Sequence, residues 1–166
     1  MCGIVGFLKI NNIKFDLTDE SSLRKMTNTL SHRGPDHQNI WIEDNIYLGH
    51  TRLSIIDLSK NGNQPMISHS GRYVITFNGE IYNFKKLKSE LGKNINWRSE
   101  TDTEVLLECI EHWGLEKTLN SARGMFAFAL WDRRNKNLII AKDRIGEKPL
   151  YYGMIKGNFV FSSELK

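Results

Sequence analysis

The chain has 166 residues, of which 40% are hydrophobic and 25% charged, with a formal net charge of +4. This size and composition predict one globular domain with its own core and argue against a disulfide-stapled miniprotein. The two cysteines lie far apart, and neither a leader peptide nor a long apolar run is visible, so we expect a cytoplasmic protein without a membrane span.

Cys2 follows the initiator methionine directly. Methionine aminopeptidase removes Met1 when residue 2 is small, which leaves a thiol and a free α-amino group on one residue. A thiol titrates near ~8.5 and an α-amine near ~7.7 to 8.0, so the amine can accept the thiol proton, directly or through a water. Cys2 is therefore a candidate N-terminal nucleophile, although position 2 alone is explained more simply by a small residue heading a strand.

The first half of the chain predicts a strand, a helix, a hairpin and a long loop. In order, these are a strand at 3–10, a helix at 20–30 with candidate caps at 16–19, a turn at 31–36, a hairpin of 40–42 and 46–48, extended chain at 49–57, and a loop at 58–70.

The strongest strand signal is at 73–77, and we expect this strand to end at Asn78-Gly79-Glu80, in a corner leading to a helix capped by Asn83. Thr101 or Asp102 is expected to cap the next helix, with Glu104 closing a capping box on Thr101.

That helix carries Cys109 on its apolar face, where we interpret it as a core residue, and Gly114 ends it. The remaining predictions are a helix at 115–119 and strands at 125–131, 138–141, 150–152 and 159–162. This order of elements favours an α+β fold with antiparallel sheets.

Polar residues lie at the ends of several predicted elements, where functional sites are commonly built. The Asn78 amide and the N–H of Gly79, which a ligand can approach because glycine lacks a Cβ, suit an oxyanion hole. Arg52 offers a fork for a carboxylate, and Glu80 or Asp102 can pair with an ammonium group. Together these groups suit an amino-acid substrate, although a turn, a surface ion and a helix cap would explain them separately.

Several other classes of function are not indicated. The basic residues at 85–88 and 133–136 have no interleaved aromatic residues and no helix-turn-helix pattern, so we expect no nucleic-acid partner. The five histidines lack metal-site spacing, and no GxGxxG or GxxxxGK[ST] motif is present. We therefore predict no metal and no nucleotide site within these residues.

Seven motifs carry a resemblance to a known family. They are CGIVGF at Cys2, SHRGPD at Ser31, GHTRLSIID at Gly49, FNGEIYN at Phe77, TDTEV at Thr101, RGMFAFALWD at Arg123 and KDRIGEKPLYY at Lys142. Nearly the whole chain resembles the N-terminal glutaminase domain of asparagine synthetases, which are class II glutamine amidotransferases. NGEIYN resembles that branch more than the glucosamine-phosphate synthase or purine amidotransferase branches.

The resemblance implies a four-layer αββα sandwich, the N-terminal-nucleophile hydrolase fold. It also implies that Cys2, once Met1 is removed, attacks the side-chain amide of L-glutamine to form a γ-glutamyl thioester. Asn78 and Gly79 would hold the oxyanion, and water would then release glutamate.

The same resemblance assigns the substrate pocket. Arg52 would bind the α-carboxylate and Asp102 the α-amino group of glutamine. Glu80 and the backbone of Leu53 and Ile55 would complete the pocket.

In the family, ammonia passes to a C-terminal synthetase domain that uses ATP and Mg, and no such domain with its SGGxDS-type phosphate loop is found within residues 1–166. We therefore expect a single glutaminase domain at 1–166, without a cofactor of its own, whose partners are L-glutamine and an ammonia-accepting synthetase domain. The oligomeric state stays open, because such a domain standing alone can expose an apolar patch and form a homo-oligomer.

Two alternatives stay open at this point. The same glutaminase chemistry can serve another acceptor, such as a sugar acid in polysaccharide assembly. If Met1 is retained, the chain is instead a non-catalytic glutamine-binding module, because the α-amine is then lost to a peptide bond.

Overall fold

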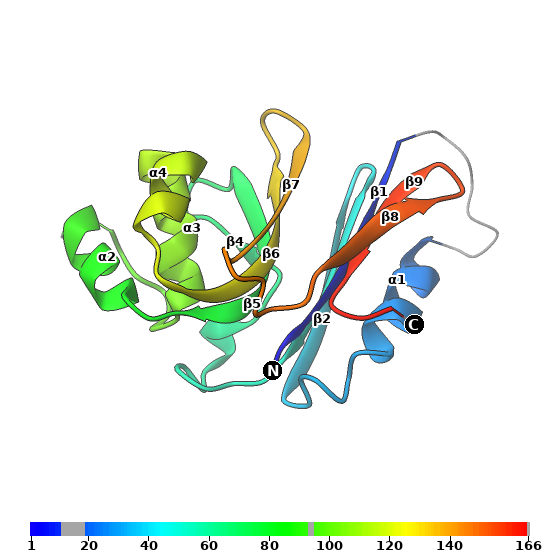
Figure 1. Ribbon diagram of the computed structural model, residues 1–166, viewed down its shortest axis with the longest axis horizontal. Helices are drawn as coiled ribbons and strands as arrows, with labels where there is room; N and C mark the ends of the chain where they lie inside the picture. The colour runs from blue at the N-terminus through cyan, green and yellow to red at the C-terminus, as the bar shows by residue number, and fades with distance from the viewer. Residues whose placement is uncertain (11–18, 93–94, 166) are drawn as a thin grey trace.

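Two antiparallel sheets pack face to face, and helices cover the outer face of each (Figure 1). The structure is a computed structural model and describes residues 1–10, 19–92 and 95–165. Sheet A has the strand order β2-β3-β1-β9-β8 and sheet B the order β4-β5-β6-β7. The strands of sheet A are β1 (Gly3–Lys9), β2 (His37–Glu43), β3 (Ile46–Arg52), β8 (Tyr151–Ile155) and β9 (Asn158–Ser162). Those of sheet B are β4 (Met66–Ile67), β5 (Tyr73–Ile81), β6 (Gly124–Asp132) and β7 (Asn137–Lys142). The helices are α1 (Asp19–Asn28), α2 (Phe84–Leu91), α3 (Asp102–Trp113), α4 (Leu115–Ser121) and the short 3-10 helix η1 (Lys60–Gly62).

Sheet A is built around β1, which pairs antiparallel with β3 on one side and β9 on the other. Alternate side chains of a strand point to opposite faces, so Phe7 and Tyr47 both point outward, with ring centroids 4.3 Å apart. Leu23 of α1 packs on these rings, which places α1 over the outer face of sheet A. The inward face carries Leu48 and Phe161.

Strand β6 and the first five residues of β5 are mostly apolar, and both of their faces are buried. Phe77 and Phe128 face α2 and α3, whereas Val74 and Trp131 face sheet A. Complete burial of a side chain such as Phe128 stabilises the fold by roughly 1.5–3 kcal/mol relative to exposure. Cys109 of α3 lies in the helix-facing cluster, as predicted.

The layers therefore run α1, sheet A, sheet B and α2–α4, which confirms the expected α+β fold and its four-layer αββα arrangement. In the described part of the chain, no helix is long and apolar enough to cross a membrane. The N-terminus lies where the two sheets come together (Figure 1).

Strand β5 departs from the sequence prediction. It does not end at Phe77 but continues through Asn78-Gly79-Glu80 to Ile81, because β6 provides a pairing partner for every one of these residues. A Cβ on Gly79 would lie 2.4 Å from the carbonyl oxygen of Met125, so glycine is required by the close approach of β6. The interpretation of Asn-Gly as a corner was therefore wrong.

The capping box predicted for α3 forms only in part. Thr101 Oγ1 accepts from Glu104 N at 3.2 Å, which confirms Thr101 as the N-cap. The Glu104 carboxylate, however, accepts from Ser99 N at 2.7 Å instead of returning to Thr101. Glu104 thus holds the segment before α3 in place.

Other predicted ends shift by smaller amounts. Asn83 is the N-cap residue of α2 but does not cap it with its side chain, which instead binds Ser121 O and Arg123 N. The extended chain expected at 49–57 leaves the sheet after Arg52. Of the candidate caps at 16–19, residues 16–18 lie outside the described residues, and α1 begins at Asp19.

Candidate active site

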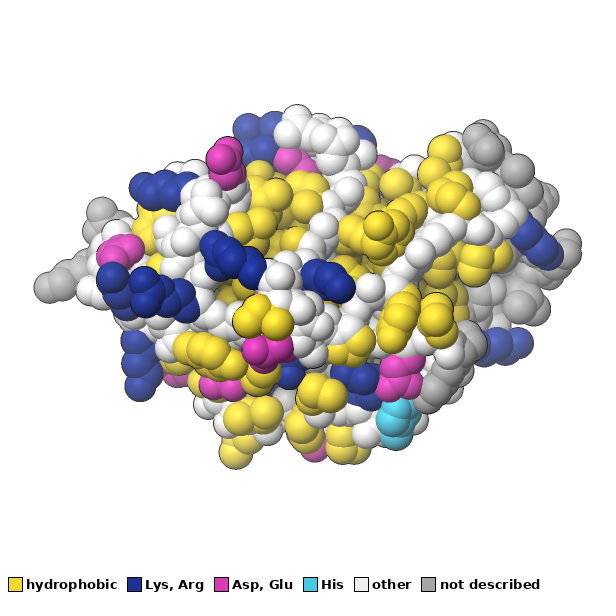
Figure 2. Space-filling view, viewed as in Figure 1, with side chains coloured by type: hydrophobic (Ala, Val, Ile, Leu, Met, Phe, Trp, Pro, Cys, Tyr) yellow, Lys and Arg dark blue, Asp and Glu magenta, His cyan; other side chains and the backbone are white. Residues whose placement is uncertain are grey.

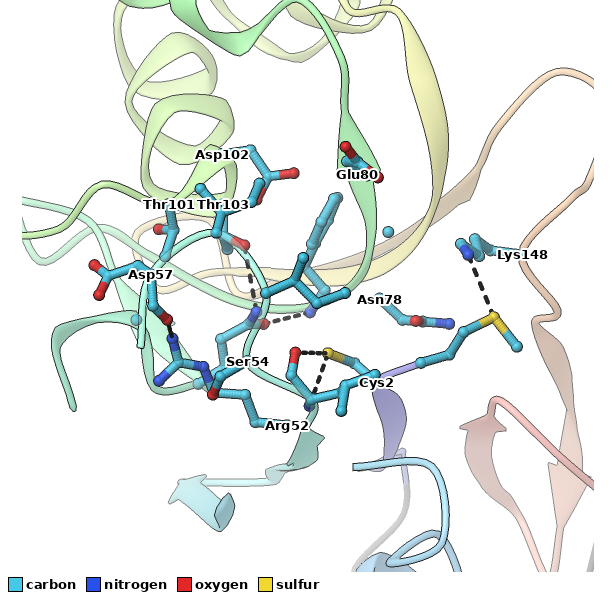
Figure 3. A pocket seen from close by; sticks show the side chains of 18 of the residues that line it. Cys2, Arg52, Ser54, Asp57, Asn78, Glu80, Thr101, Asp102, Thr103 and Lys148 are labelled. Carbon is cyan, nitrogen blue, oxygen red and sulfur yellow. Dashed lines mark hydrogen bonds between the residues drawn. The ribbon is translucent and has the colours of Figure 1, made fainter. Parts of the chain in front are cut away.

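A cleft of about 160 Å³ lies at the end of the sandwich where the N-terminus meets sheet B (Figure 3). Its walls come from the start of β1, the chain following β3, the far end of β5 and the first turn of α3. It is lined by Met1, Cys2, Arg52, Leu53, Ser54, Ile55, Ile56, Asp57, Gly62, Gln64, Phe77, Asn78, Gly79, Glu80, Thr101, Asp102, Thr103, Met125 and Lys148.

The Cys2 thiol lies just before the N-terminal end of β1, against the backbone of Leu53. Its Sγ lies 3.5 Å from Leu53 N and 3.7 Å from Leu53 O. Burial raises the pKa of the Cys2 thiol above its ordinary value, while the Leu53 N–H, the charged N-terminus and Arg52 oppose this shift. Because the net shift favours the neutral thiol, a nearby base must remove its proton before it can act as a nucleophile.

Arg52 is buried, and the chain following β3 wraps around its guanidinium. Its Nη1 donates to Ser59 O at 2.7 Å and to Asn63 Oδ1 at 2.9 Å, and its Nη2 donates to Asp57 O. A Cβ on Gly62 would lie 2.2 Å from Nη2, so η1 can pack this closely only with glycine at that position. These bonds use three of the five guanidinium N–H groups and fix the fork at the wall of the cleft.

The end of β5 directs hydrogen-bond donors at the cleft. Phe77 N and Ile81 N both point away from β6, to Gln64 Oε1 at 2.6 Å and Asp102 Oδ2 at 2.8 Å. Backbone groups alternate along a strand, so the N–H of Gly79 points to the same open edge, between these two. The Asn78 side chain is 2% exposed, and its Nδ2 has no hydrogen-bond partner among the described residues. A buried donor of this kind is costly unless a ligand satisfies it.

Two carboxylates stand at the opposite end of the cleft from Cys2. Burial raises the pKa of Asp102 to about 6, and the charge of Glu80 adds to this shift, while the N–H groups of Ile81 and Thr103 oppose it. Glu80 is only half-buried and shares the cleft wall. An incoming cation would favour the ionised form of Asp102, so this end of the cleft suits an ammonium group.

The chain after β7 adds a lysine to the cleft. Lys148 is buried, and its Nζ donates to Met1 Sδ at 3.3 Å (Figure 3). The loop carrying it is ordered by Asp143, whose carboxylate accepts from the backbone N–H groups of Gly146, Glu147, Lys148 and Phe126. The pKa of Asp143 is lowered because these four N–H groups outweigh its burial.

All eight residues named from the sequence line this one cleft: Cys2, Arg52, Leu53, Ile55, Asn78, Gly79, Glu80 and Asp102. Ile55 lines the cleft although its side chain is exposed. Sequence reasoning missed Gln64, Thr103, Met125 and Lys148 as lining residues. Lys148 and Met125 belong to motifs that carry the family resemblance, which is a usable signal, whereas Gln64 lies in a segment interpreted as surface loop.

The arrangement as a whole combines a thiol, two oriented amide donors, an arginine fork and two carboxylates around one small cavity. Such a set can bind a zwitterionic amino acid by its α-groups and present its side chain to the thiol. Among the described residues, no three His, Cys, Asp or Glu side chains form a group that could hold a metal ion.

Comparison with known proteins agrees with this description. Residues 1–166 match the family described as "Glutamine amidotransferase domain". The chain is 39% identical over 169 residues to asparagine synthetase [glutamine-hydrolyzing] 3 from Bacillus subtilis, a match that covers all of this chain and 27% of that protein. Asparagine synthetase B from Escherichia coli is 39% identical over 171 residues, with 29% of its length covered. Amidase chry2 from Gibberella zeae is 36% identical over 177 residues, with 26% covered. In each match the whole of this chain is aligned, so it spans only 26% to 29% of the length of these relatives.

Among solved structures, glutamine phosphoribosylpyrophosphate amidotransferase from Bacillus subtilis shares the fold, with a TM-score of 0.79 over 98% of this chain and 42% of that one. The two sequences are 20% identical, so this likeness concerns the architecture alone. Because the family match spans every residue and alignments over the whole of this chain give 39% identity, the chain belongs to the glutamine amidotransferase domain family, and its architecture is that of the solved amidotransferase.

Proposed function

We propose that this domain hydrolyses L-glutamine to glutamate and ammonia, with Cys2 as the nucleophile. One observation carries the proposal: the Nδ2 of buried Asn78, which has no partner in the described part of the chain, and the cleft-facing N–H of Gly79 lie in the same cavity as the Cys2 thiol. Two donors beside a thiol are what acyl transfer through a tetrahedral oxyanion needs.

The first half-reaction forms a thioester. The α-amine of Cys2, freed by removal of Met1, takes the thiol proton, and the sulfur attacks the side-chain amide carbon of glutamine. Negative charge develops on the amide oxygen, which receives the donors of Asn78 and Gly79. The C–N bond then breaks, and the protonated amine returns its proton to the leaving nitrogen, so ammonia departs and a γ-glutamyl thioester stays on Cys2.

The second half-reaction consumes water. The same amine removes a proton from a water molecule, which attacks the thioester carbon, and the same two donors hold the second oxyanion. The C–S bond breaks, glutamate leaves, and the thiol is regenerated.

The substrate α-groups are recognised at the far end of the cleft. Arg52 has its guanidinium fixed by three acceptors, so its remaining N–H groups can meet the α-carboxylate with little loss of side-chain entropy. Asp102 and Glu80 receive the α-ammonium group. The backbone of Leu53 and Ile55 closes the wall between the two.

The ammonia acceptor lies outside this domain, and we propose an asparagine synthetase-type domain, since the relatives that carry that name match the whole chain. The outward-facing strand β8 supports a covering partner: Tyr151, Tyr152, Met154 and Ile155 are all exposed, and Figure 2 shows hydrophobic side chains gathered on this face. The match to Amidase chry2 supports the alternative of a different acceptor served by the same glutaminase. ATP and Mg belong, on this proposal, to the acceptor domain.

Intact mass before and after treatment with a glutamine-analogue diazoketone tests the glutaminase directly, together with a glutamate-release assay. We expect loss of methionine, one covalent adduct and steady glutamate release, with both adduct and release absent in Cys2→Ala. Glutamate release by Cys2→Ala at the wild-type rate would exclude Cys2 as the nucleophile. Retained Met1, together with glutamine binding and no turnover, would favour the non-catalytic glutamine-binding module instead.

A further inference from the structure

The open edge of β5 beside the cleft is completed by side chains instead of a strand. Within residues 1–10, 19–92 and 95–165, strand β4 pairs with β5 only at Ile75 and Val74, so this edge has no neighbouring strand from there to Ile81. Backbone N–H and C=O groups on such an edge need other partners when they are buried. Phe77 is the first edge residue beyond β4, and the donors of Asn78 and Gly79 follow it directly.

Gln64 occupies the place that a neighbouring strand would take. Its side chain is 5% exposed, and its Oε1 accepts from Phe77 N at 2.6 Å, as a strand carbonyl would. Its Nε2 donates to Thr103 Oγ1 at 3.3 Å in the first turn of α3. The neighbour of Thr103 is Asp102, which accepts from Ile81 N. Along this edge, the backbone N–H groups of Phe77 and Ile81 flank that of Gly79. They are held by the side chains of Gln64 and Asp102, which are linked through the first turn of α3.

We call the Gln64 and Asp102 side chains with the first turn of α3 the clamp. It leaves one backbone donor of this edge, the N–H of Gly79, for a ligand. The N–H of Phe77 is used by Gln64 and that of Ile81 by Asp102, whereas the N–H of Gly79 between them faces the cavity. We infer that Gln64 is a positioning residue for the oxyanion donors of Asn78 and Gly79, holding the edge of β5 at the distance that the reacting carbonyl requires. This inference rests on the proposed glutaminase activity.

The contacts of Gln64 indicate that it affects kcat more than the affinity for glutamine. The oxygen and the nitrogen of the Gln64 amide both bind protein partners, whereas the α-groups of glutamine are recognised by Arg52 and Asp102 on the proposed function. A displacement of about 1 Å in a reacting group costs roughly 100-fold in rate. Loss of one oxyanion donor costs roughly 100-fold to 1,000-fold in kcat. Loosening the clamp should therefore lower kcat and leave glutamine affinity nearly unchanged.

The test uses mature protein carrying Gln64→Leu, which removes both contacts of the side chain. We expect kcat for glutamate release to fall 10-fold to 100-fold. The glutamine Kd, measured by calorimetry with Gln64→Leu added to Cys2→Ala, should stay within threefold of Cys2→Ala alone. Alkylation of Cys2 by iodoacetamide, a displacement that forms no oxyanion, should proceed within twofold of the wild-type rate.

A second pair of variants keeps the test decisive if Gln64→Leu does not fold. Thr103→Val removes only the acceptor for Gln64 Nε2, and we expect a fall in kcat of about threefold to tenfold. Gln64→Glu keeps an acceptor for Phe77 N and, when protonated, also a donor for Thr103. Its kcat relative to wild type at the same pH should therefore rise at least threefold from pH 8 to pH 6.

Three results would overturn the inference. They are a Gln64→Leu kcat within twofold of wild type, parallel losses of glutamine affinity, alkylation rate and kcat, and a Gln64→Glu activity ratio that does not change with pH. Failure of the proposed function gives a different result, since wild-type protein would then release no glutamate at all.

Discussion

The imidazole Nε2 of His50 in sheet A lies 3.0 Å from the carbonyl oxygen of Phe77 in sheet B. A carbonyl oxygen only accepts hydrogen bonds, so Nε2 carries the proton. The Phe77 carbonyl belongs to the peptide unit that also contains the Asn78 nitrogen. His50 therefore ties the two sheets together at the peptide unit that joins Phe77 to Asn78, and Thr76 Oγ1 adds a second link by donating to Gly49 O at 3.1 Å.

His50 should make the stability of the domain depend on pH. It is completely buried, and burial lowers its pKa from 6.5 to about 3. The unfolded chain therefore binds a proton at His50 between those values while the folded chain does not, so this contribution to stability is complete above pH 6.5 and is lost as pH falls toward 3. The slope is at most about 1.4 kcal/mol per pH unit. Urea unfolding from pH 7 to pH 4 should show a shallower slope for His50→Gln than for wild type, and equal slopes would contradict the assignment.

Gly79 should tolerate no side chain. A Cβ there would lie 2.4 Å from Met125 O and 2.7 Å from Phe126 Cα, so Gly79→Ala must separate β5 from β6. We expect a loss of about 1–3 kcal/mol of stability and loss of glutamate release. Gly153→Ala on β8 is the matched control, because nothing lies within 4 Å of its added Cβ, and it should change stability by less than about 0.5 kcal/mol. Thermal unfolding of both variants compares them, and equal stability of the two would refute the steric argument.

Asp102 should link glutamine binding to proton release. Its pKa is raised to about 6 by burial, and an ammonium group beside it favours the ionised carboxylate. In Cys2→Ala, calorimetry should therefore show glutamine affinity falling by up to about tenfold per pH unit below pH 6. Buffers of different ionisation enthalpy should reveal protons released on binding near this pH. An affinity that does not vary between pH 5 and pH 8 would remove Asp102 from the recognition of the α-amino group.

The same carboxylate should cost stability in the free domain. Since the folded pKa of Asp102 is raised, its ionisation disfavours folding progressively from about pH 4 to pH 6, and the cost is complete above that window. Asp102→Asn should consequently unfold at an equal or higher temperature than wild type at pH 7 while its glutamine affinity falls at least tenfold. A variant that lost stability as well as affinity would contradict this cost, because an asparagine side chain at this position keeps an oxygen that can accept from Ile81 N and lacks only the charge.

The sequence predicted the strands and helices better than it predicted the way they connect. Position 2, the arginine at the end of β3 and the Asn-Gly pair were identifiable because each breaks a local pattern. The corner expected at Asn78 was wrong because pairing with β6, a strand far along the chain, overrides the local preference of Asn-Gly for a turn.

Gln64 marks the limit of local reasoning. It lies in a segment rich in Asn and Gly that is typical of surface loop, yet its side chain is buried between β5 and α3. Its two partners, Phe77 and Thr103, are distant in sequence and come together only when both sheets and α3 have formed. No periodicity or spacing within residues 58–70 carries that information.

Strand β1 is inserted between β3 and β9, so its second neighbour, Asn158–Ser162, is synthesised long after β1 itself. Translation at about 5–20 residues per second separates the synthesis of these two strands by on the order of ten seconds. During that interval β1 cannot yet pair with β9, so sheet A is incomplete beside β1. If Met1 is removed as proposed, an aminopeptidase can therefore act on the nascent chain while β1 still lacks its second neighbour, before the cleft around Cys2 has formed.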